Sequence, residues 1–197
     1  MKIYLVRHGE TDWNKVKRWQ GHTDIPLNET GIEQANALAQ TIVNYSNISI
    51  IYASPLIRAY KTAEILNQAL NVEIVVRERL KEVCLGVWEG MDYENVVANY
   101  PTDYKLWCSH QEGVDPNLEV ESLPALQQRA LLELETLRKI NTKDFMIVGH
   151  GAWIGNLLRQ FLQLDGDRFL HIENAKLIEI KFDEESGQYH VVTDLKS

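Results

Sequence analysis

Histidine and arginine side chains follow three apolar runs of this chain, at points where strands would end. Arg7 and His8 come directly after the run at residues 3–6, Arg58 lies shortly after a second run, and His150 follows a third. A neutral imidazole offers a nucleophilic nitrogen near neutral pH. Arginine offers a permanently charged planar fork that suits oxyanions. These residue types predict a site for an anionic substrate, with His8 as a candidate nucleophile.

Strands and helices alternate along the chain, and this alternation is what would bring those side chains together. It predicts an α/β fold with three layers, in which helices cover both faces of a mostly parallel central sheet. A C-terminal antiparallel hairpin is expected around Gly187. Apolar runs predict strands at 3–6, 48–53, 72–76, 145–148, 177–182 and 189–192. Helical spacing and capping residues predict helices at 31–45, 55–70, 93–99, 102–109, 124–140 and 152–164.

Three of the predicted strands end beside the candidate side chains. Parallel neighbouring strands place their carboxyl ends at one edge of a sheet, where ligands bind in open α/β folds. Two helices are expected to begin at the same edge, one after Ser54 as N-cap and one after Gly151. Their free backbone N–H groups suit phosphate. Thr30 is the expected N-cap of the helix at 31–45, and residues 12–29 are expected to form a loop.

The composition limits the class of protein. The chain has 197 residues, of which 24% are charged and 45% hydrophobic, so a single domain over residues 1–197 is expected. The formal net charge of −8 argues against a general nucleic-acid or membrane-binding surface, and an anion must therefore be attracted by a local positive pocket. Cys84 and Cys108 are interpreted as free thiols.

The sequence also bears on the cellular location of the protein and on whether it needs a metal or a cofactor. No apolar run approaches the about 20 residues of a membrane span, and the N-terminal residues lack a signal core, so a cytoplasmic protein is expected. The six histidines are scattered, without an HxxxH pattern or a Cys/His cluster. No P-loop or GxGxxG is present. We therefore expect neither a metal nor a cofactor. The sequence is compatible with a homodimer but contains no feature that requires one.

Short motifs spread over most of the chain point to one known family. The run Arg7-His8-Gly9-Glu10-Thr11 opens the series, and together these landmarks resemble the histidine phosphatase (phosphoglycerate mutase-like) superfamily. The later landmarks are Asn14, Gln20-Gly21, Asp24, Pro26-Leu27, Thr30-Gly31, Gln34-Ala35, Ser54-Pro55-Leu56, Arg58-Ala59, Thr62-Ala63, Leu80-Lys81-Glu82, the segment 86–90, Glu121-Ser122 and Gly149-His150-Gly151.

The resemblance implies a role for each candidate residue. His8 would form phosphohistidine, while Arg7 and Arg58 bind the phosphoryl oxygens. His150 would donate to the same oxygens from the opposite side. Glu82 matches the carboxylate that gives the leaving group its proton. The expected substrate-binding residues are Asn14, Gln20, Gly21 and Gly151, and the family needs no metal for this chemistry.

The stretch after Glu82 decides the branch. It reads Val83-Cys84-Leu85-Gly86-Val87-Trp88, without the Arg-His-Tyr-Gly segment of the mutases. It resembles the broad phosphatase branch, which includes α-ribazole phosphatase-like, fructose-2,6-bisphosphatase-like and phosphoserine phosphatase-like enzymes. Val120 departs from the glycine that commonly precedes Glu121-Ser122. We expect a phosphomonoesterase acting on a small phosphorylated metabolite. The alternatives are a cofactor-dependent phosphoglycerate mutase and a non-catalytic phospho-ligand binding module.

Structural roles remain open for several of these side chains. His8 could be a structural histidine at a strand end, Arg58 an exposed helix residue paired with Glu64 or another acid, and His150 a helix cap. Glu82 could be a solvated acid, because three more acids lie nearby, namely Glu78, Glu89 and Glu94. A pocket formed by Trp88, Tyr93 and Trp107 would favour a partly apolar leaving group, although core packing explains tryptophans equally well.

Overall fold

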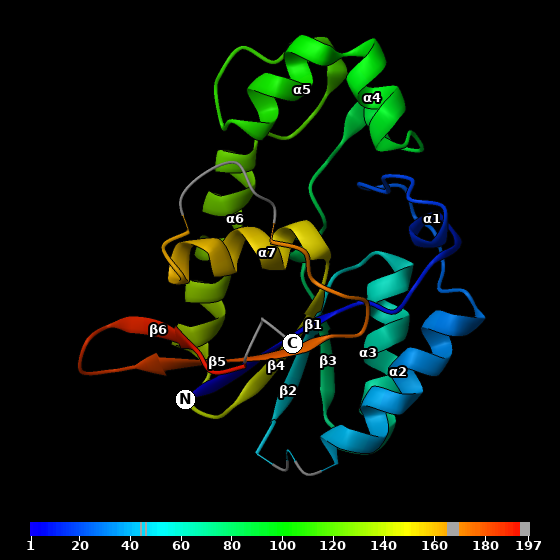
Figure 1. Cartoon of the computed structure of the whole chain (residues 1–197). Coiled ribbons are helices and arrows are strands. Elements are labelled where there is room, and N and C mark those ends of the chain that lie inside the picture. Colours follow the sequence, from blue (N-terminus) through cyan, green and yellow to red (C-terminus); the bar gives the residue numbers. More distant parts are fainter. Residues whose placement is uncertain (44, 46, 165–169, 194–197) are drawn as a thin grey trace.

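The computed structural model describes residues 1–43, 45, 47–164 and 170–193, and a six-stranded sheet forms its centre (Figure 1). The strand order is β3-β2-β4-β1-β5-β6. The strands are β1 (Lys2–Arg7), β2 (Ile50–Ala53), β3 (Glu73–Val76), β4 (Phe145–Gly149), β5 (Leu177–Asp183) and β6 (Gln188–Val191). The α-helices are α1 (Asp12–Lys15), α2 (Glu29–Ile42), α3 (Ile57–Leu70), α4 (Tyr93–Asn99), α5 (Pro101–Cys108), α6 (Leu123–Ile140) and α7 (Gly151–Phe161).

The direction of the strands matches the predicted fold class. β1 pairs in parallel with β4, and β2 pairs in parallel with both β4 and β3. β5 and β6 are antiparallel to their neighbours and form the expected C-terminal hairpin. The fold is therefore the predicted α/β arrangement, with a mostly parallel sheet and an antiparallel edge.

Helices cover both faces of the sheet because its strands are apolar on both sides. Along β1, Ile3 and Leu5 pack into one buried cluster with α6 and α7. Tyr4 and Val6 point the other way and pack with α2 and α3. Side chains alternate between the two faces of a strand, so a continuous apolar run indicates burial on both sides. The three layers of the prediction are confirmed (Figure 1).

The parallel register places three strand ends at one edge. Arg7 at the end of β1 is opposite Gly149 at the end of β4, and Ala53 at the end of β2 is opposite Val148. The loops that follow these strands therefore start side by side. This is the convergence that the sequence predicted, and it determines where the candidate side chains meet.

The helices differ most from the sequence prediction in three places, while α5, α6 and α7 each start one residue earlier than expected. Asn28, not Thr30, is the N-cap of α2, and its Oδ1 accepts the N–H of Gly31 at 2.8 Å. Helix α3 begins at Ile57 instead of residue 55: Leu56 is its N-cap residue, and the Ser54 hydroxyl lies beside His150 and accepts the N–H of Leu56 at 3.3 Å. The expected loop at 12–29 contains the short helix α1, which Thr11 and Asn14 close with a capping box.

A close contact between glycines holds the loop after β1 against α2. A Cβ atom on Gly9 would lie 2.3 Å from the carbonyl oxygen of Gly31, and a Cβ atom on Gly31 would lie 2.1 Å from the oxygen of Glu10. Only glycine permits this approach at both positions. Gly9 thus allows the chain to leave β1 sharply, which fixes His8 at the edge of the sheet.

Helices α4 and α5 lie together above the carboxyl end of the sheet, with the start of α6 below α5 (Figure 1). Their aromatic residues pack with Trp19 and Trp88, whose ring centroids lie 6.1 Å apart. This segment is the insertion between Glu82 and α6, and it forms one side of the cleft described below.

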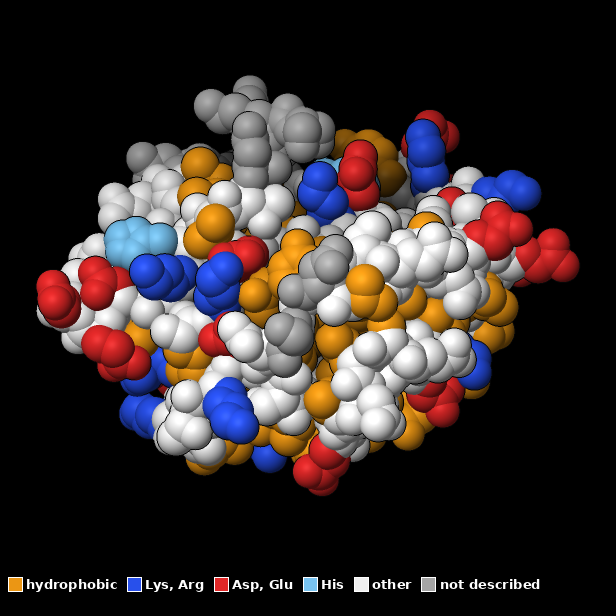
Figure 2. Space-filling view, turned by 90° about the horizontal axis from the view of Figure 1, so that it is seen from below, with side chains coloured by type: hydrophobic (Ala, Val, Ile, Leu, Met, Phe, Trp, Pro, Cys, Tyr) orange, Lys and Arg blue, Asp and Glu red, His pale blue; other side chains and the backbone are white. Residues whose placement is uncertain are grey.

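Within the described residues, no helix is both long and apolar enough to cross a bilayer. Acidic and basic side chains are interspersed on the face seen from below (Figure 2). A mixed surface of this kind offers no broad positive face for nucleic acid.

Candidate active site

His8 is held at the end of β1 with one ring nitrogen free. Its Nδ1 lies 2.7 Å from the carbonyl oxygen of Gly9, and a carbonyl can only accept, so Nδ1 carries the proton. The lone pair of the neutral ring is then on Nε2. His8 is 2% exposed, and burial beside Arg7 and Arg58 lowers its pKa well below 6.5. The imidazole is therefore neutral near pH 7, as a nucleophile must be.

Arg58 reaches the same place from the first turn of α3. It is fully buried, and its Nη1 and Nη2 donate to the carbonyl oxygens of Thr23 and Gly21 at 2.9 and 2.8 Å. Burial lowers its pKa to about 10, which leaves it charged at neutral pH. Arg58 is thus not the exposed partner of Glu64, which pairs with Lys61 instead.

The loop that Arg58 holds is also held from its other side. The carboxylate of Glu89 accepts the backbone N–H groups of His22 and Thr23 at 2.8 and 2.9 Å. Gly21 has a positive φ of 51°, and a Cβ atom there would lie 2.2 Å from Glu89 Oε1. The two charged side chains therefore fix Gln20 and Gly21, two predicted substrate-binding residues, at the cavity wall.

His150 lies behind His8 rather than on the cavity wall. It is fully buried, its ring centroid lies 5.2 Å from that of His8, and its Nε2 is 2.8 Å from the hydroxyl oxygen of Ser54. Its Nδ1 has no protein partner. His150 is also the N-cap residue of α7 but makes no side-chain capping bond. The cap position and a site beside His8 are therefore compatible.

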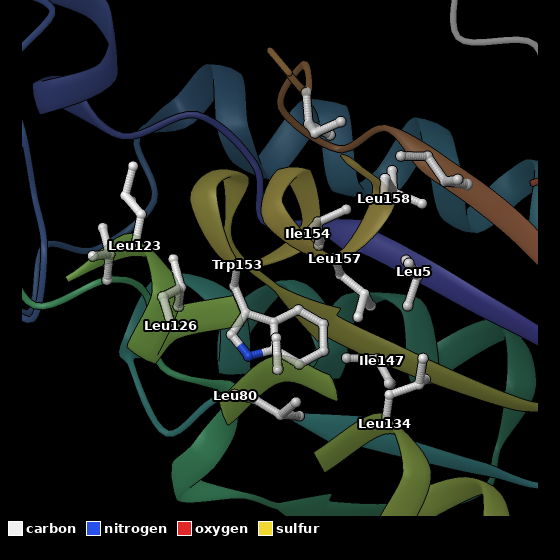
Figure 3. Close-up of a cluster of buried hydrophobic side chains, with 14 of the residues drawn as sticks. Leu5, Leu80, Leu123, Leu126, Leu134, Ile147, Trp153, Ile154, Leu157 and Leu158 are labelled. Atoms are coloured by element: carbon white, nitrogen blue, oxygen red, sulfur yellow. The ribbon is translucent and has the colours of Figure 1, made fainter. Parts of the chain in front are cut away.

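Glu82 reaches the site from the loop before the insertion, and the first turn of α7 holds its carboxylate. Its Oε2 accepts the N–H of Ala152 at 3.1 Å, and its Oε1 accepts the N–H of Trp153 at 3.0 Å. The indole of Trp153 is embedded between β1, β4, α6 and α7 (Figure 3) and donates to the oxygen of Arg79 at 2.9 Å. This packing fixes the start of α7 and therefore the position of Glu82.

The other acids near Glu82 in the sequence have different surroundings. Glu78 is exposed and pairs with Lys81, Glu89 binds the loop at 21–23, and Glu94 is exposed. Glu82 is the acid on the wall of the cavity within the described part of the chain. Of these candidates, it alone is placed to exchange a proton with a bound ligand.

Arg7, His8, Arg58 and Glu82 meet at a cavity of about 370 Å³. Asn14 also lines it, and Asn174 Nδ2 donates to Asn14 Oδ1 at 3.3 Å. Gly151 lies on the wall of an adjoining cavity, where a Cβ atom would come 3.3 Å from Arg7 Nε. The structure thus brings all nine predicted site residues to one edge of the sheet, with His150 behind the wall.

Unpartnered polar atoms show what this cavity can bind. The Nε atoms of Arg7 and Arg58 are buried and have no protein partner. Buried N–H groups are normally satisfied, so two free guanidinium donors at one cavity indicate a site for an oxyanion. No group of three or more His, Cys, Asp or Glu side chains in the described ranges is placed to hold a metal ion.

The aromatic wall differs from the prediction. Tyr93 and Trp107 line the cavity as expected, but Trp88 is fully buried, and Trp19 and Tyr104 take its place. Trp88 is absent from the wall because it forms the centre of the aromatic packing in the insertion. Sequence spacing gave no signal for this, because a tryptophan on a wall and one in a core have the same neighbours in the chain.

Sequence reasoning missed two residues near His8. Asn174 Nδ2 donates to the carbonyl oxygen of His8 at 3.1 Å, and Arg18 lies on the wall of both cavities. Asn174 follows a stretch without periodicity, and its partner lies over a hundred residues away, so no local pattern indicates it. A sequence signal did exist for Arg18, because Lys17 and Arg18 are adjacent basic residues inside the predicted loop.

A family model agrees with this geometry. The sequence model of the histidine phosphatase superfamily, branch 1, matches residues 3–195. The chain belongs to this superfamily. From Ile3 onward, the match spans all six strands of the sheet and the segments that carry the candidate side chains.

Named relatives of this histidine phosphatase fall into two groups. Phosphoserine phosphatase 1 of Hydrogenobacter thermophilus is 35% identical over 86% of this chain and 80% of its own length. A probable phosphoglycerate mutase, GpmB of Yersinia pestis, is 33% identical over 93% of this chain and 86% of its own. The crystal structure of a phosphoserine phosphatase from Entamoeba histolytica, in complex with 3-phosphoglyceric acid, has a TM-score of 0.82. It is 32% identical and covers 98% of this chain and 95% of that one.

Proposed function

We propose that this histidine phosphatase is a metal-independent phosphomonoesterase that hydrolyses a small phosphorylated metabolite through phosphohistidine on His8. The observation that carries the proposal is one cavity that joins a neutral imidazole to two unpartnered guanidinium Nε atoms, from Arg7 and Arg58. An imidazole supplies the nucleophile and the arginines bind the group that it attacks. A binding module needs the arginines but has no use for an imidazole with a free Nε2.

The reaction runs in two displacements. In the first, His8 Nε2 attacks phosphorus, the P–O bond to the leaving group breaks, and Glu82 gives the leaving oxygen a proton. Charge on the equatorial oxygens is stabilised by Arg7 and Arg58, while His150 packs against the ring of His8 with ring centroids 5.2 Å apart. In the second, Glu82 takes a proton from water, which attacks phosphorus and releases His8 and inorganic phosphate. Asn14, Gln20, Gly21 and Gly151 contact the bound group.

The named relatives guide the choice of substrate. Phosphoserine and 3-phosphoglycerate are the first compounds to test, because relatives are named for the one or were crystallised with the other. The cavity of about 370 Å³ suits a molecule of that size. Its aromatic wall can pack against the carbon skeleton of the leaving group.

Phosphate release with EDTA present tests the proposal. Wild type should release inorganic phosphate from at least one of phosphoserine, 3-phosphoglycerate and p-nitrophenyl phosphate, and His8→Ala should abolish it. The matched control is His190→Ala, which removes an exposed imidazole on β6 and should keep full activity. Activity in the purified His8 variant, or its loss on adding EDTA, would contradict the proposal.

A phosphoglycerate mutase is the second candidate, because one group of relatives carries that name. A mutase transfers the phosphoryl group to a second hydroxyl, whereas a phosphatase transfers it to water. Incubation with 3-phosphoglycerate and a priming bisphosphate separates the two, since 2-phosphoglycerate accumulates only with a mutase. We expect inorganic phosphate, because the stretch after Glu82 lacks the mutase segment.

We extend the proposal to the domain organisation, the cellular location and the oligomeric state of the enzyme. The chain acts as one domain, since both buried clusters flank the same sheet. Cys84 and Cys108 are free thiols, which fits a reducing cytoplasm. A homodimer remains the oligomeric state to test by light scattering.

A further inference from the structure

The cleft continues outward from His8 in two directions. One is lined by the aromatic residues Trp19, Tyr93, Tyr104 and Trp107, and we call it the aromatic branch. The other is a cavity of about 440 Å³ whose wall carries Lys17, Arg18 and His171, and we call it the basic branch. Arg18 and Trp19 line both. A substrate whose phosphoryl group binds at His8 must extend its leaving group into these branches.

The basic branch holds more positive charge than a phosphoryl group requires. A phosphomonoester dianion is matched by Arg7 and Arg58. Arg18 and Lys17 then remain, and neither makes a side-chain hydrogen bond or ion pair with the described residues. Glu82 is the acid on this wall, and backbone N–H groups of α7 hold its carboxylate. Two cations at the mouth of a cleft therefore lack a counter-charge.

Acidic residues outnumber basic ones over the whole chain, whose formal net charge is −8, so the positive charge at this wall comes from the local arrangement of its cations. Unpaired cations that line a concave wall concentrate the positive potential there, and a second anionic group on the ligand would benefit from it.

The backbone around Arg18 is firmly positioned. The N–H of Trp19 donates to the oxygen of Met91 at 2.9 Å, and the N–H of Gly90 donates to the oxygen of Trp19 at 2.8 Å. Asp92 faces Arg18 across an isolated bridge, yet its carboxylate caps α4 by accepting the N–H of Asn95 at 2.8 Å. The Asp92 carboxylate keeps its charge in this role but makes no ion pair with the Arg18 guanidinium, which stays available to a ligand.

We propose that Arg18, assisted by Lys17, selects substrates whose leaving group carries a carboxylate. The inference rests on the proposed phosphatase function and names its substrate class: a small phosphorylated hydroxy acid. Arg18 offers a fork to the carboxylate at the junction of the two branches, while the aromatic branch packs against the carbon skeleton. Arg18 acts on substrate choice and takes no part in the bond changes at phosphorus.

Two substrates that differ only at the carboxylate test this assignment. 3-Phosphoglycerate carries the carboxylate, and glycerol 3-phosphate has a hydroxymethyl group in its place. We expect wild type to prefer 3-phosphoglycerate. Arg18→Gln should lower its kcat/KM about tenfold or more, mainly through KM, because a charge-assisted hydrogen bond is lost. The loss for glycerol 3-phosphate should be much smaller, and Arg18→Lys should recover part of the preference.

Lys15→Gln is the matched control. Lys15 is an exposed basic residue of α1, close to Arg18 in the chain, but it lines neither branch. Its removal subtracts the same charge from the molecule and should leave the ratio of the two kcat/KM values unchanged. Titration of 3-phosphoglycerate into His8→Ala and into His8→Ala combined with Arg18→Gln gives a binding readout that needs no turnover.

The outcomes separate this inference from the function on which it rests. Equal losses for both substrates, or an equal effect of Lys15→Gln, would overturn the role of Arg18 while leaving the phosphatase intact. The role of Arg18 would also be overturned if the wild type hydrolysed 3-phosphoglycerate and glycerol 3-phosphate with equal kcat/KM. Failure to release phosphate from any phosphomonoester would overturn the phosphatase function and this inference with it.

Discussion

Glu82→Gln should slow the enzyme in a way that depends on the leaving group. Glutamine has nearly the same shape but cannot deliver the proton that an alkoxide leaving group needs. General acid catalysis contributes about 10²- to 10⁴-fold, so kcat/KM for 3-phosphoglycerate should fall by that factor. p-Nitrophenolate leaves without being protonated, and kcat/KM for p-nitrophenyl phosphate should fall far less. We use kcat/KM because it reports transfer to His8 and excludes the later attack by water.

The same substitution has a cost in stability that follows from its contacts. The amide oxygen can keep the bonds from the N–H groups of Val83 and Trp153, both 3.0 Å long. The amide nitrogen would face the N–H of Ala152, which now donates to Glu82 Oε2 at 3.1 Å. Losing this bond costs about 1–3 kcal/mol. Thermal unfolding should shift down by about 2–4 °C for each kcal/mol.

Glu78→Gln is the control for this prediction, because Glu78 is an exposed acid of the same region. It should leave kcat/KM for both substrates and the thermal unfolding midpoint unchanged. Equal losses of kcat/KM for 3-phosphoglycerate and p-nitrophenyl phosphate in the Glu82 variant would refute the role of proton donor. They would show that the carboxylate only holds the start of α7.

Arg58, Gly21 and the two buried histidines give three further expected outcomes. Arg58→Lys should lower kcat about 10²- to 10³-fold in steady-state phosphate release, because one ammonium cannot hold the loop and the transition state together. Gly21→Ala should lower the thermal unfolding midpoint followed by circular dichroism, since its Cβ atom would lie 2.2 Å from Glu89 Oε1 at a φ of 51°. Burial lowers the pKa of both His8 and His150 well below 6.5, so they take up protons on unfolding. The unfolding free energy in urea should therefore fall below about pH 6.5, by up to about 1.4 kcal/mol per pH unit for each histidine.

Each of these outcomes has a clear contrary result. Full activity in Arg58→Lys would show that charge alone suffices at that position. An unchanged midpoint in Gly21→Ala would mean that Glu89 can move away without loss. A free energy that stays constant from about pH 6.5 to 5, or the same slope in His8→Ala, would contradict the neutral buried state of His8.

Sequence reasoning succeeded where the signal is local and repeated. The apolar run of β1 is followed at once by Arg7 and His8, and the same pattern recurs before His150. Parallel pairing of the strands then follows from their alternation with helices, and the register puts Arg7 opposite Gly149. The position of the site was therefore predictable without knowing a single contact.

Sequence reasoning failed where a side chain contacts a residue that is distant in the chain. Ser54 has the sequence context of a helix cap, but Leu56 takes the cap position of α3 and the Ser54 hydroxyl lies 2.8 Å from His150 Nε2. The sequence allowed Trp88 either a wall or a core position, and it lies in the core, because the aromatic packing of the insertion surrounds it. The unpaired state of Arg18 depends on where Asp92 directs its carboxylate, and only the folded chain determines that.

Trapping the covalent intermediate tests the central claim most directly. Wild type mixed with substrate labelled in the phosphoryl group should be quenched in base after a few milliseconds and digested, and the labelled peptide identified by mass spectrometry. We predict label on the peptide that contains His8, stable in base and lost in acid, and none in His8→Ala. Turnover without label on His8, or label on another residue, would contradict the phosphohistidine account.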